Sequence, residues 1–113
     1  MNYNIKARSP FTRAAKKLGK RYRSFKEDYA KFLDQLEENP QLGTDLGNGL
    51  RKIRMAITSK GRGKSGGARV ITFTVITALT ETEVNLIYIY DKADRENITT
   101  AELLELLKRI GLR

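Results

Sequence analysis

The chain has 113 residues, which fits one domain with a single core of modest size. Its hydrophobic content of 40% is normal for a folded protein, and no apolar run approaches the roughly 18 residues of a membrane span. The absence of cysteine and histidine excludes disulfide frameworks, thiolate metal sites and imidazole acid–base catalysis. The opening MNYNIKARSPF lacks the hydrophobic region of a signal peptide, and the absence of cysteine makes a reducing cytoplasm the expected location.

A net charge of +9 indicates a polyanionic partner, and the charges are distributed unevenly. Residues 1–26 hold nine Lys or Arg and no acid, residues 27–47 hold six acids and one Lys, and residues 48–70 hold seven Lys or Arg and no acid. The first basic block is also compatible with a merely solubilising surface. The second lies within predicted strands and a glycine-rich loop, which favours a specific role. No repeat or linker divides residues 1–113, so one domain is expected.

Helical periodicity dominates the first third of the chain. A first helix is predicted to begin at Ser9-Pro10, an N-cap followed by proline, and to end within residues 20–23. A capping box at Ser24–Glu27 precedes a second helix from Phe25 to Glu38, whose outer face carries the acidic block. The two helices are predicted to form an αα-hairpin with one shared apolar face.

The period then changes from 3.6 to two, which indicates strands. Residues 52–57 alternate apolar and polar side chains, as in a half-buried strand. Residues 59–67 (SKGRGKSGG) are expected to form a hairpin loop. Residues 69–76 and 84–90 are apolar on both faces and predict two central strands, joined by a turn over residues 77–83.

The two ends of the chain complete the predicted fold. Residues 3–6 predict an additional strand, and residues 40–49 predict a loop rich in Gly, Asn and Asp. A capping box at Thr99–Glu102 and a staple of Ile98 with Leu103 begin a short C-terminal helix. The expected class is α+β: two N-terminal helices packed on an antiparallel sheet of three to four strands, plus the C-terminal helix, with helices covering one sheet face.

Basic and phenolic side chains are predicted to gather on one face of these strands. The expected cluster contains Lys52, Arg54, Arg69, Lys92 and one or both of Tyr88 and Tyr90. The tyrosines would then lie opposite Ile87 and Ile89. Three loop cations are placed to close over the cluster: Lys60, Arg62 and Lys64. Two alternatives stay open, because the tyrosines would also fit beneath the C-terminal helix and the Lys52–Arg54 face would also fit an exposed strand surface.

Dense positive charge with phenols suits phosphate chemistry. Such groups bind phosphates and stabilise the transition state of phosphoryl transfer, and RNA supplies its own nucleophile, the 2′-hydroxyl. No pair of carboxylates lies in the basic region, which argues against a two-metal nuclease. Crowded like charges also lower a lysine pKa, which would help a Lys or Tyr to transfer protons. Composition alone does not distinguish an RNA-cleaving site from a non-catalytic RNA-binding surface.

Four segments together resemble a known family: Phe32–Gly43 (F-x-x-x-L-x-x-N-P-x-L-G), Gly49–Arg54 (GLRKIR), Ser59–Val70 (SKGRGKSGGARV) and Ile87–Lys92 (IYIYDK). Over residues 9–107 the chain resembles the RelE/HigB-like toxins of bacterial type II toxin–antitoxin modules, in the RelE/ParE superfamily. The resemblance implies a RelE-like fold and a ribosome-dependent mRNA endonuclease that cuts in the ribosomal A site, leaving a 2′,3′-cyclic phosphate and a 5′-hydroxyl. It implies no metal or organic cofactor, and a cognate antitoxin that often carries a helix-turn-helix domain.

The resemblance also implies roles for individual residues. The catalytic candidates are all cations: Arg54, Lys64, Arg69 and Lys92. Lys64 and Arg69 would stabilise the scissile phosphate, and Lys92 would act near the leaving oxygen or as a proton donor. The RNA-binding candidates are Arg51, Lys52, Lys60, Arg62 and Tyr90, the last for base stacking. Some relatives carry a tyrosine near the start of the C-terminal helix, where this chain has Ile98-Thr99-Thr100, so the general base is unassigned.

Two other functions compete with this interpretation. A non-catalytic basic module would bind RNA with a steep salt dependence and would not cleave it. A ParE-like gyrase inhibitor would share the fold, although such proteins usually lack the full set of catalytic cations. Mapping mRNA ends on stalled ribosomes distinguishes all three.

Overall fold

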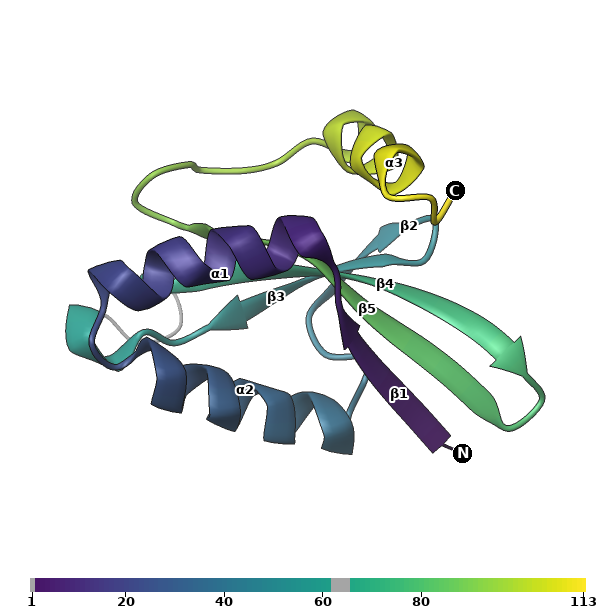
Figure 1. Cartoon of the computed structure of the whole chain (residues 1–113), viewed down its shortest axis with the longest axis horizontal. Coiled ribbons are helices and arrows are strands. Elements are labelled where there is room, and N and C mark those ends of the chain that lie inside the picture. The colour runs from purple at the N-terminus through teal and green to yellow at the C-terminus, as the bar shows by residue number, and fades with distance from the viewer. Residues whose placement is uncertain (1, 62–65) are drawn as a thin grey trace.

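The computed structural model, which describes residues 2–61 and 66–113, is a five-stranded sheet with helices on both faces (Figure 1). In chain order the elements are β1 (Asn2–Ala7), α1 (Ser9–Arg21), α2 (Phe25–Glu38), β2 (Thr44–Gly47), β3 (Leu50–Met55), the 3-10 turn η1 (Thr58–Lys60), β4 (Ala68–Ala78), β5 (Glu81–Asp91) and α3 (Thr100–Arg109). None of the helices in these described segments is long and apolar enough to cross a bilayer.

The α+β class and the predicted helices are confirmed, whereas the sheet is larger and mixed. Its strand order is β1-β5-β4-β3-β2, with β1 parallel to β5 and every other pair antiparallel. The additional strand, β2, lies inside the predicted loop over residues 40–49. Three consecutive residues with positive φ, Gly47, Asn48 and Gly49, build the tight turn that returns β2 onto β3.

The hairpin of β4 and β5 extends further than the sequence predicts. The turn expected over residues 77–83 is wrong for most of that range, because β4 runs to Ala78 and β5 begins at Glu81. Thr and Val side chains in this part of the chain suit extended backbone, which favours strand over turn. The result is a long arm whose tip carries the almost fully exposed Leu79.

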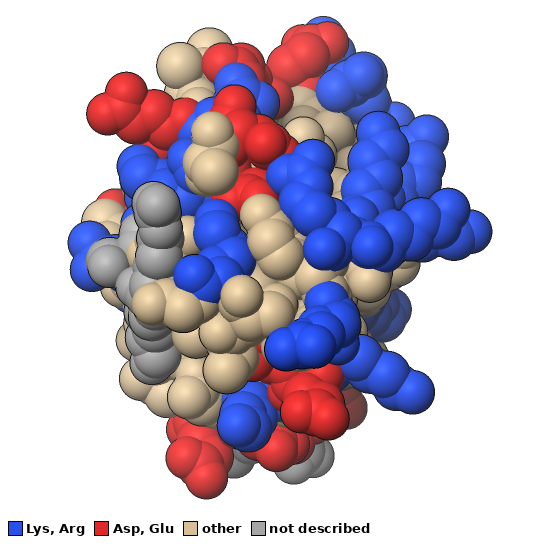
Figure 2. Space-filling view, turned by 90° about the vertical axis from the view of Figure 1, so that its left-hand side faces the viewer, with Lys and Arg blue, Asp and Glu red and all other residues tan. Residues whose placement is uncertain are grey.

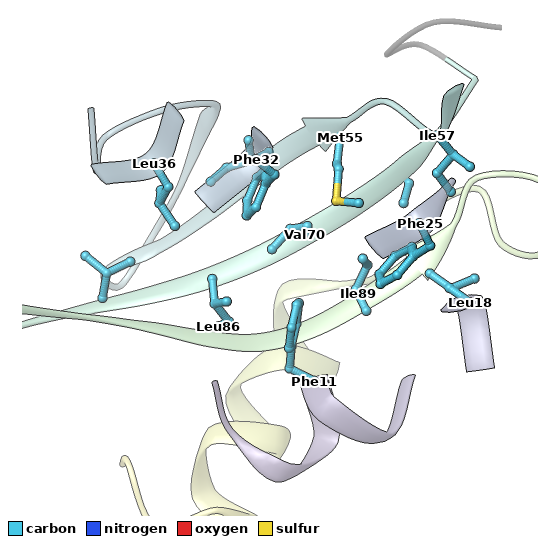
Figure 3. Close-up of a cluster of buried hydrophobic side chains, with 13 residues drawn as sticks. Phe11, Leu18, Phe25, Phe32, Leu36, Met55, Ile57, Val70, Leu86 and Ile89 are labelled. Atoms are coloured by element: carbon cyan, nitrogen blue, oxygen red, sulfur yellow. The ribbon is translucent and has the colours of Figure 1, made fainter. Parts of the chain in front are cut away.

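Helices α1 and α2 pack on one face of the sheet through their shared apolar side. Phe11, Phe25 and Phe32 meet Met55 and Val70 in this main core (Figure 3). The predicted αα-hairpin is therefore confirmed.

The cap predicted for α1 is wrong, and the cap predicted for α2 is confirmed in its position only. The N-cap of α1 is Arg8 rather than Ser9, with no side-chain cap bond. Ser24 is the N-cap residue of α2, but its side chain makes no cap hydrogen bond, and its hydroxyl instead donates to Asp28. Asp28 itself is buried, although it was expected on the outer acidic face.

Helix α3 lies on the opposite face, which corrects the expectation that helices cover one face. Leu103 and Leu107 are fully buried against Leu50 and Ile71 in a second apolar cluster. The capping box at the start of α3 is confirmed on one side, because the Thr99 hydroxyl accepts from the backbone N–H of Glu102.

A bulge in β5 changes which way its side chains point. Ile71 pairs with Tyr88, but the next residue of β4 pairs with Leu86, so Ile87 is an extra residue in β5. Ile87 therefore packs on the α3 side with Tyr88 and Tyr90, while Ile89 packs in the main core. The expectation that Ile87 and Ile89 share a face is wrong for that reason.

Candidate nucleic-acid interface

Three adjacent strands place basic and phenolic residues in one row. Arg54 of β3 pairs with Arg69 of β4, and Arg69 pairs with Tyr90 of β5. In the preceding row, Lys52 pairs with Ile71, which packs in the cluster on the α3 side of the sheet. Residues in register on neighbouring strands point to the same face, so the row and Lys52 share the face that α3 partly covers.

Arg69 is the central member of the row and is only 6% exposed. A buried arginine is unusual. Burial, and next the positive charge of Arg54, lower the pKa of Arg69, while the nearby Tyr90 raises it. A bound anion would relieve the repulsion between the two guanidinium groups.

Two lysines lie beside the row and are held by the segment between β5 and α3. The Lys92 ammonium donates to the backbone oxygen of Glu96 at 2.8 Å, and the Lys52 ammonium donates to Oδ1 of Asn97 at 3.2 Å. Since Glu96 and Asn97 are consecutive, this segment brings Lys52 and Lys92 to one place. We name Lys52, Arg54, Arg69 and Lys92 the cation cluster.

Tyr90 places a phenol beside the cation cluster. The side chain is 5% exposed, and its ring lies 6.4 Å from the ring of Tyr88. Burial raises the pKa of Tyr90, against the smaller opposite effects of Arg69 and Arg95. The Tyr90 hydroxyl is buried and has no hydrogen-bond partner in the described parts of the chain. Both sequence interpretations of Tyr90 therefore hold, because it packs beneath α3 and also stands next to Arg69.

Two other candidates do not join this cluster, and two more fall on residues that the structure does not describe. Arg51 donates to the backbone oxygens of Leu42 and Gly43, so its guanidinium holds the segment before β2. The Lys60 ammonium donates to the Asp91 carboxylate at 2.6 Å, and this carboxylate lies outside the cluster. Arg62 and Lys64 lie outside the described residues.

Asp91 is a structural residue that the sequence interpretation missed. Its side chain is fully buried and accepts from Lys60, from Arg21 at 3.1 Å, from the Tyr22 hydroxyl and from the Ala93 N–H. Burial raises the pKa of Asp91, but these hydrogen bonds outweigh it and lower the pKa to about 2. The available signal was strand alternation, since Asp91 lies between Tyr90 and Lys92 and must point away from them.

The two ends of the glycine-rich loop are fixed by separate contacts. At its start, Asp28 accepts from the N–H and the hydroxyl of Thr58, and the Ser59 N–H donates to Ser24. At its end, a Cβ on Gly67 would lie 2.2 Å from the carbonyl oxygen of Met55. Only glycine permits this close approach, which leads the chain directly into Arg69.

The arrangement suits the binding of a phosphate group at the cation cluster. Arginine and lysine donors at one point stabilise the negative charge of a phosphodiester and the greater charge of its transition state. Within residues 2–61 and 66–113, no group of three or more acidic side chains is placed to hold a metal ion.

A comparison with protein-family models gives an independent result. Residues 9–111 match the family described as the RelE toxin of the RelE / RelB toxin-antitoxin system. The match covers nearly the whole chain, including every member of the cation cluster.

Proposed function

This chain belongs to the RelE toxin family of toxin–antitoxin systems, and from that premise we propose that it is a metal-independent, ribosome-dependent mRNA endonuclease. It acts in the cytoplasm, cuts messenger RNA in the ribosomal A site and thereby stops translation. Its partner is a cognate antitoxin, which we expect to carry a helix-turn-helix domain.

The proposed reaction is an internal transesterification of RNA. The 2′-hydroxyl gives its proton to solvent water as its oxygen attacks the adjacent phosphorus, the bond from phosphorus to the 5′-oxygen breaks, and the products are a 2′,3′-cyclic phosphate and a 5′-hydroxyl. Arg69 and Arg54 neutralise the charge that develops on the phosphate oxygens. Lys92 gives its proton to the leaving 5′-oxygen, and Lys52 binds the neighbouring backbone. Tyr90 acts as a hydrogen-bond donor, because its raised pKa keeps the phenol protonated at neutral pH.

One observation carries this proposal: Arg54, Arg69 and Tyr90 stand in direct register on three adjacent strands. Strands hold side chains more rigidly than loops do, so the donors are preorganised for a phosphate. A purely solubilising surface would not bury a guanidinium beside a second one.

The test is cleavage of mRNA on purified translating ribosomes, with the new RNA ends mapped and their chemistry determined. We expect cyclic-phosphate ends from the wild type and a loss of about 100- to 1,000-fold in rate for Arg69→Ala. Circular dichroism and urea unfolding check that Arg69→Ala is folded. Arg69 is buried, so its substitution can disturb the fold. Arg54 is exposed, and Arg54→Gln is therefore a second variant with little risk to folding. The control is Lys108→Gln on α3, which removes the same charge from another exposed position.

The other two functions predict different results. Ribosome binding without new RNA ends would identify a non-catalytic RNA-binding module. Inhibition of gyrase with intact mRNA would identify a ParE-like toxin. Full activity of both Arg69→Ala and Arg54→Gln would place the reaction elsewhere in the molecule.

A further inference from the structure

A large groove lies next to the cation cluster and is not used by the proposed reaction. Its volume is about 1060 Å³, and it runs between α1 and α3 along the end of β5. Strand β1 pairs with β5 only as far as Leu86, so the last residues of β5 have a neighbouring strand on one side only. Tyr88, Ile89 and Tyr90 form this wall of the groove.

Both sides of the groove carry positive charge. The cations that line it are Arg8, Arg13, Lys17, Arg21, Arg95 and Arg109. Figure 2 shows Lys and Arg gathered over α1, on the right-hand side of that view. Arg13, Lys17 and Arg21 follow one another at intervals of four residues, which places them in one line along the helix, with about 6 Å of rise between successive members.

The charges in the groove are only partly neutralised. Arg8 pairs with Glu83, Arg21 with Asp91 and Asp94, and Arg95 with Glu102. The two carboxylates in the lining, Asp91 and Asp94, are therefore already paired. Within the described residues, the other three cations of the lining take part in no ion pair: Arg13, Lys17 and Arg109. Arg13 and Lys17 are thus two successive members of the line on α1 without a carboxylate partner, and such unneutralised cations favour a polyanion.

The groove and the cation cluster adjoin each other at Tyr90. This residue lines the groove and is also in register with Arg69. Arg95, which also lines the groove, is close enough to influence the Tyr90 phenol. Tyr88 is half-buried in the same wall and presents an aromatic ring on which a base can stack. A polyanion that leaves the cluster can therefore continue into the groove, where both carboxylates of the lining, Asp91 and Asp94, are already paired with cations.

We propose that this groove is a second RNA-binding surface, in which Arg13 and Lys17 bind backbone phosphates beyond the cleaved bond. The inference rests on the proposed function for the identity of its ligand. Continuity with the cluster and the aromatic wall favour RNA over an acidic protein segment. The first basic block of the sequence thus has a specific role, which is to hold RNA that the cluster does not contact.

The test measures binding of a fluorescent RNA hairpin as a function of salt concentration, without ribosomes, so that the proposed ribosome-dependent reaction does not cut the probe. Arg13→Gln/Lys17→Gln should lower the slope of log K against log salt by about 1.5, as expected for two lost phosphate contacts. The control pair Lys31→Gln/Lys108→Gln removes the same charge from exposed positions outside the groove. Its slope should change much less.

Three outcomes would overturn the inference. Equal slope changes for the two pairs would show that net charge alone matters. An unchanged slope for Arg13→Gln/Lys17→Gln would show that the groove does not bind phosphates. Loss of binding to a poly-glutamate peptide, with RNA binding retained, would identify a groove for acidic protein. Failure of the proposed cleavage is a separate result, because this binding assay does not depend on it.

Discussion

On the two faces of the sheet near the end of β5, positive side chains lie in opposite electrostatic environments. On one side, Lys60 and Arg21 meet the buried carboxylate of Asp91 and are neutralised. On the other side, Arg69 meets a second guanidinium, that of Arg54, across the ladder. The two environments are one residue apart along the strand, because Tyr90 and Asp91 point to opposite faces.

This contrast separates cations that pair with a buried carboxylate from cations that gather beside one another on the opposite face of the sheet. The network at Asp91 ties the end of α1, the turn η1 and the start of the segment before α3 to one strand. It contributes stability and needs nothing from outside the chain. The cation cluster instead brings like charges together, and burial, and next the positive charge of Arg54, lower the pKa of Arg69.

The largest expected effect is on the folding side of the comparison. Asp91→Asn should lower the free energy of unfolding by about 3–5 kcal/mol, because Lys60 and Arg21 then face a neutral amide in a buried site. Urea unfolding at neutral pH measures this loss. The control is Asp34→Asn, an exposed carboxylate on α2 that makes no ion pair within the described residues, and it should change stability by less than about 0.5 kcal/mol. Similar losses in the free energy of unfolding for the two variants would show that Asp91 does not hold the network together.

A smaller effect follows from the titration of the same carboxylate. The folded pKa of Asp91 is about 2, below the ordinary value of 3.8, so its contribution to stability is complete above pH 3.8. That contribution is lost as the pH falls from 3.8 to about 2, and the shift corresponds to roughly 2 kcal/mol. Urea unfolding of the wild type and of Asp91→Asn across this range measures the difference. The gap between the two curves should narrow as the pH falls, and a constant gap would contradict the assigned direction of the pKa shift.

The sequence predicts the cation cluster well because strand alternation is a local property. Lys52 and Arg54 share a parity on β3, and the antiparallel pairing of β3 with β4 then places Arg54 opposite Arg69. Strand alternation alone does not place Lys92 in the cluster, because its position depends on how the segment after β5 folds back. The helices were predicted for a similar reason, because their apolar periodicity is strong and continuous.

Features set by tertiary contacts were not predictable in this way. The bulge at Ile87 has no glycine or proline to mark it, and it reverses the face on which that side chain packs. The sequence of α3 shows an apolar stripe but does not say which face of the sheet receives it. The groove depends on that choice, although the spacing of Arg13, Lys17 and Arg21 by four residues was a visible sign of a charged helix face.

The smallest predicted effect comes from a substitution that should change stability and activity in opposite directions. Tyr90→Phe removes a buried hydroxyl that has no partner in the described parts of the chain, so stability should stay equal or rise by up to about 1 kcal/mol. The rate of mRNA cleavage should fall by about tenfold, because the phosphate loses one hydrogen-bond donor. Urea unfolding and ribosomal cleavage assays on the same preparation measure the two effects. A variant that loses stability and keeps full activity would place Tyr90 among the packing residues beneath α3, and the proposed phosphate site would then consist of the cation cluster alone.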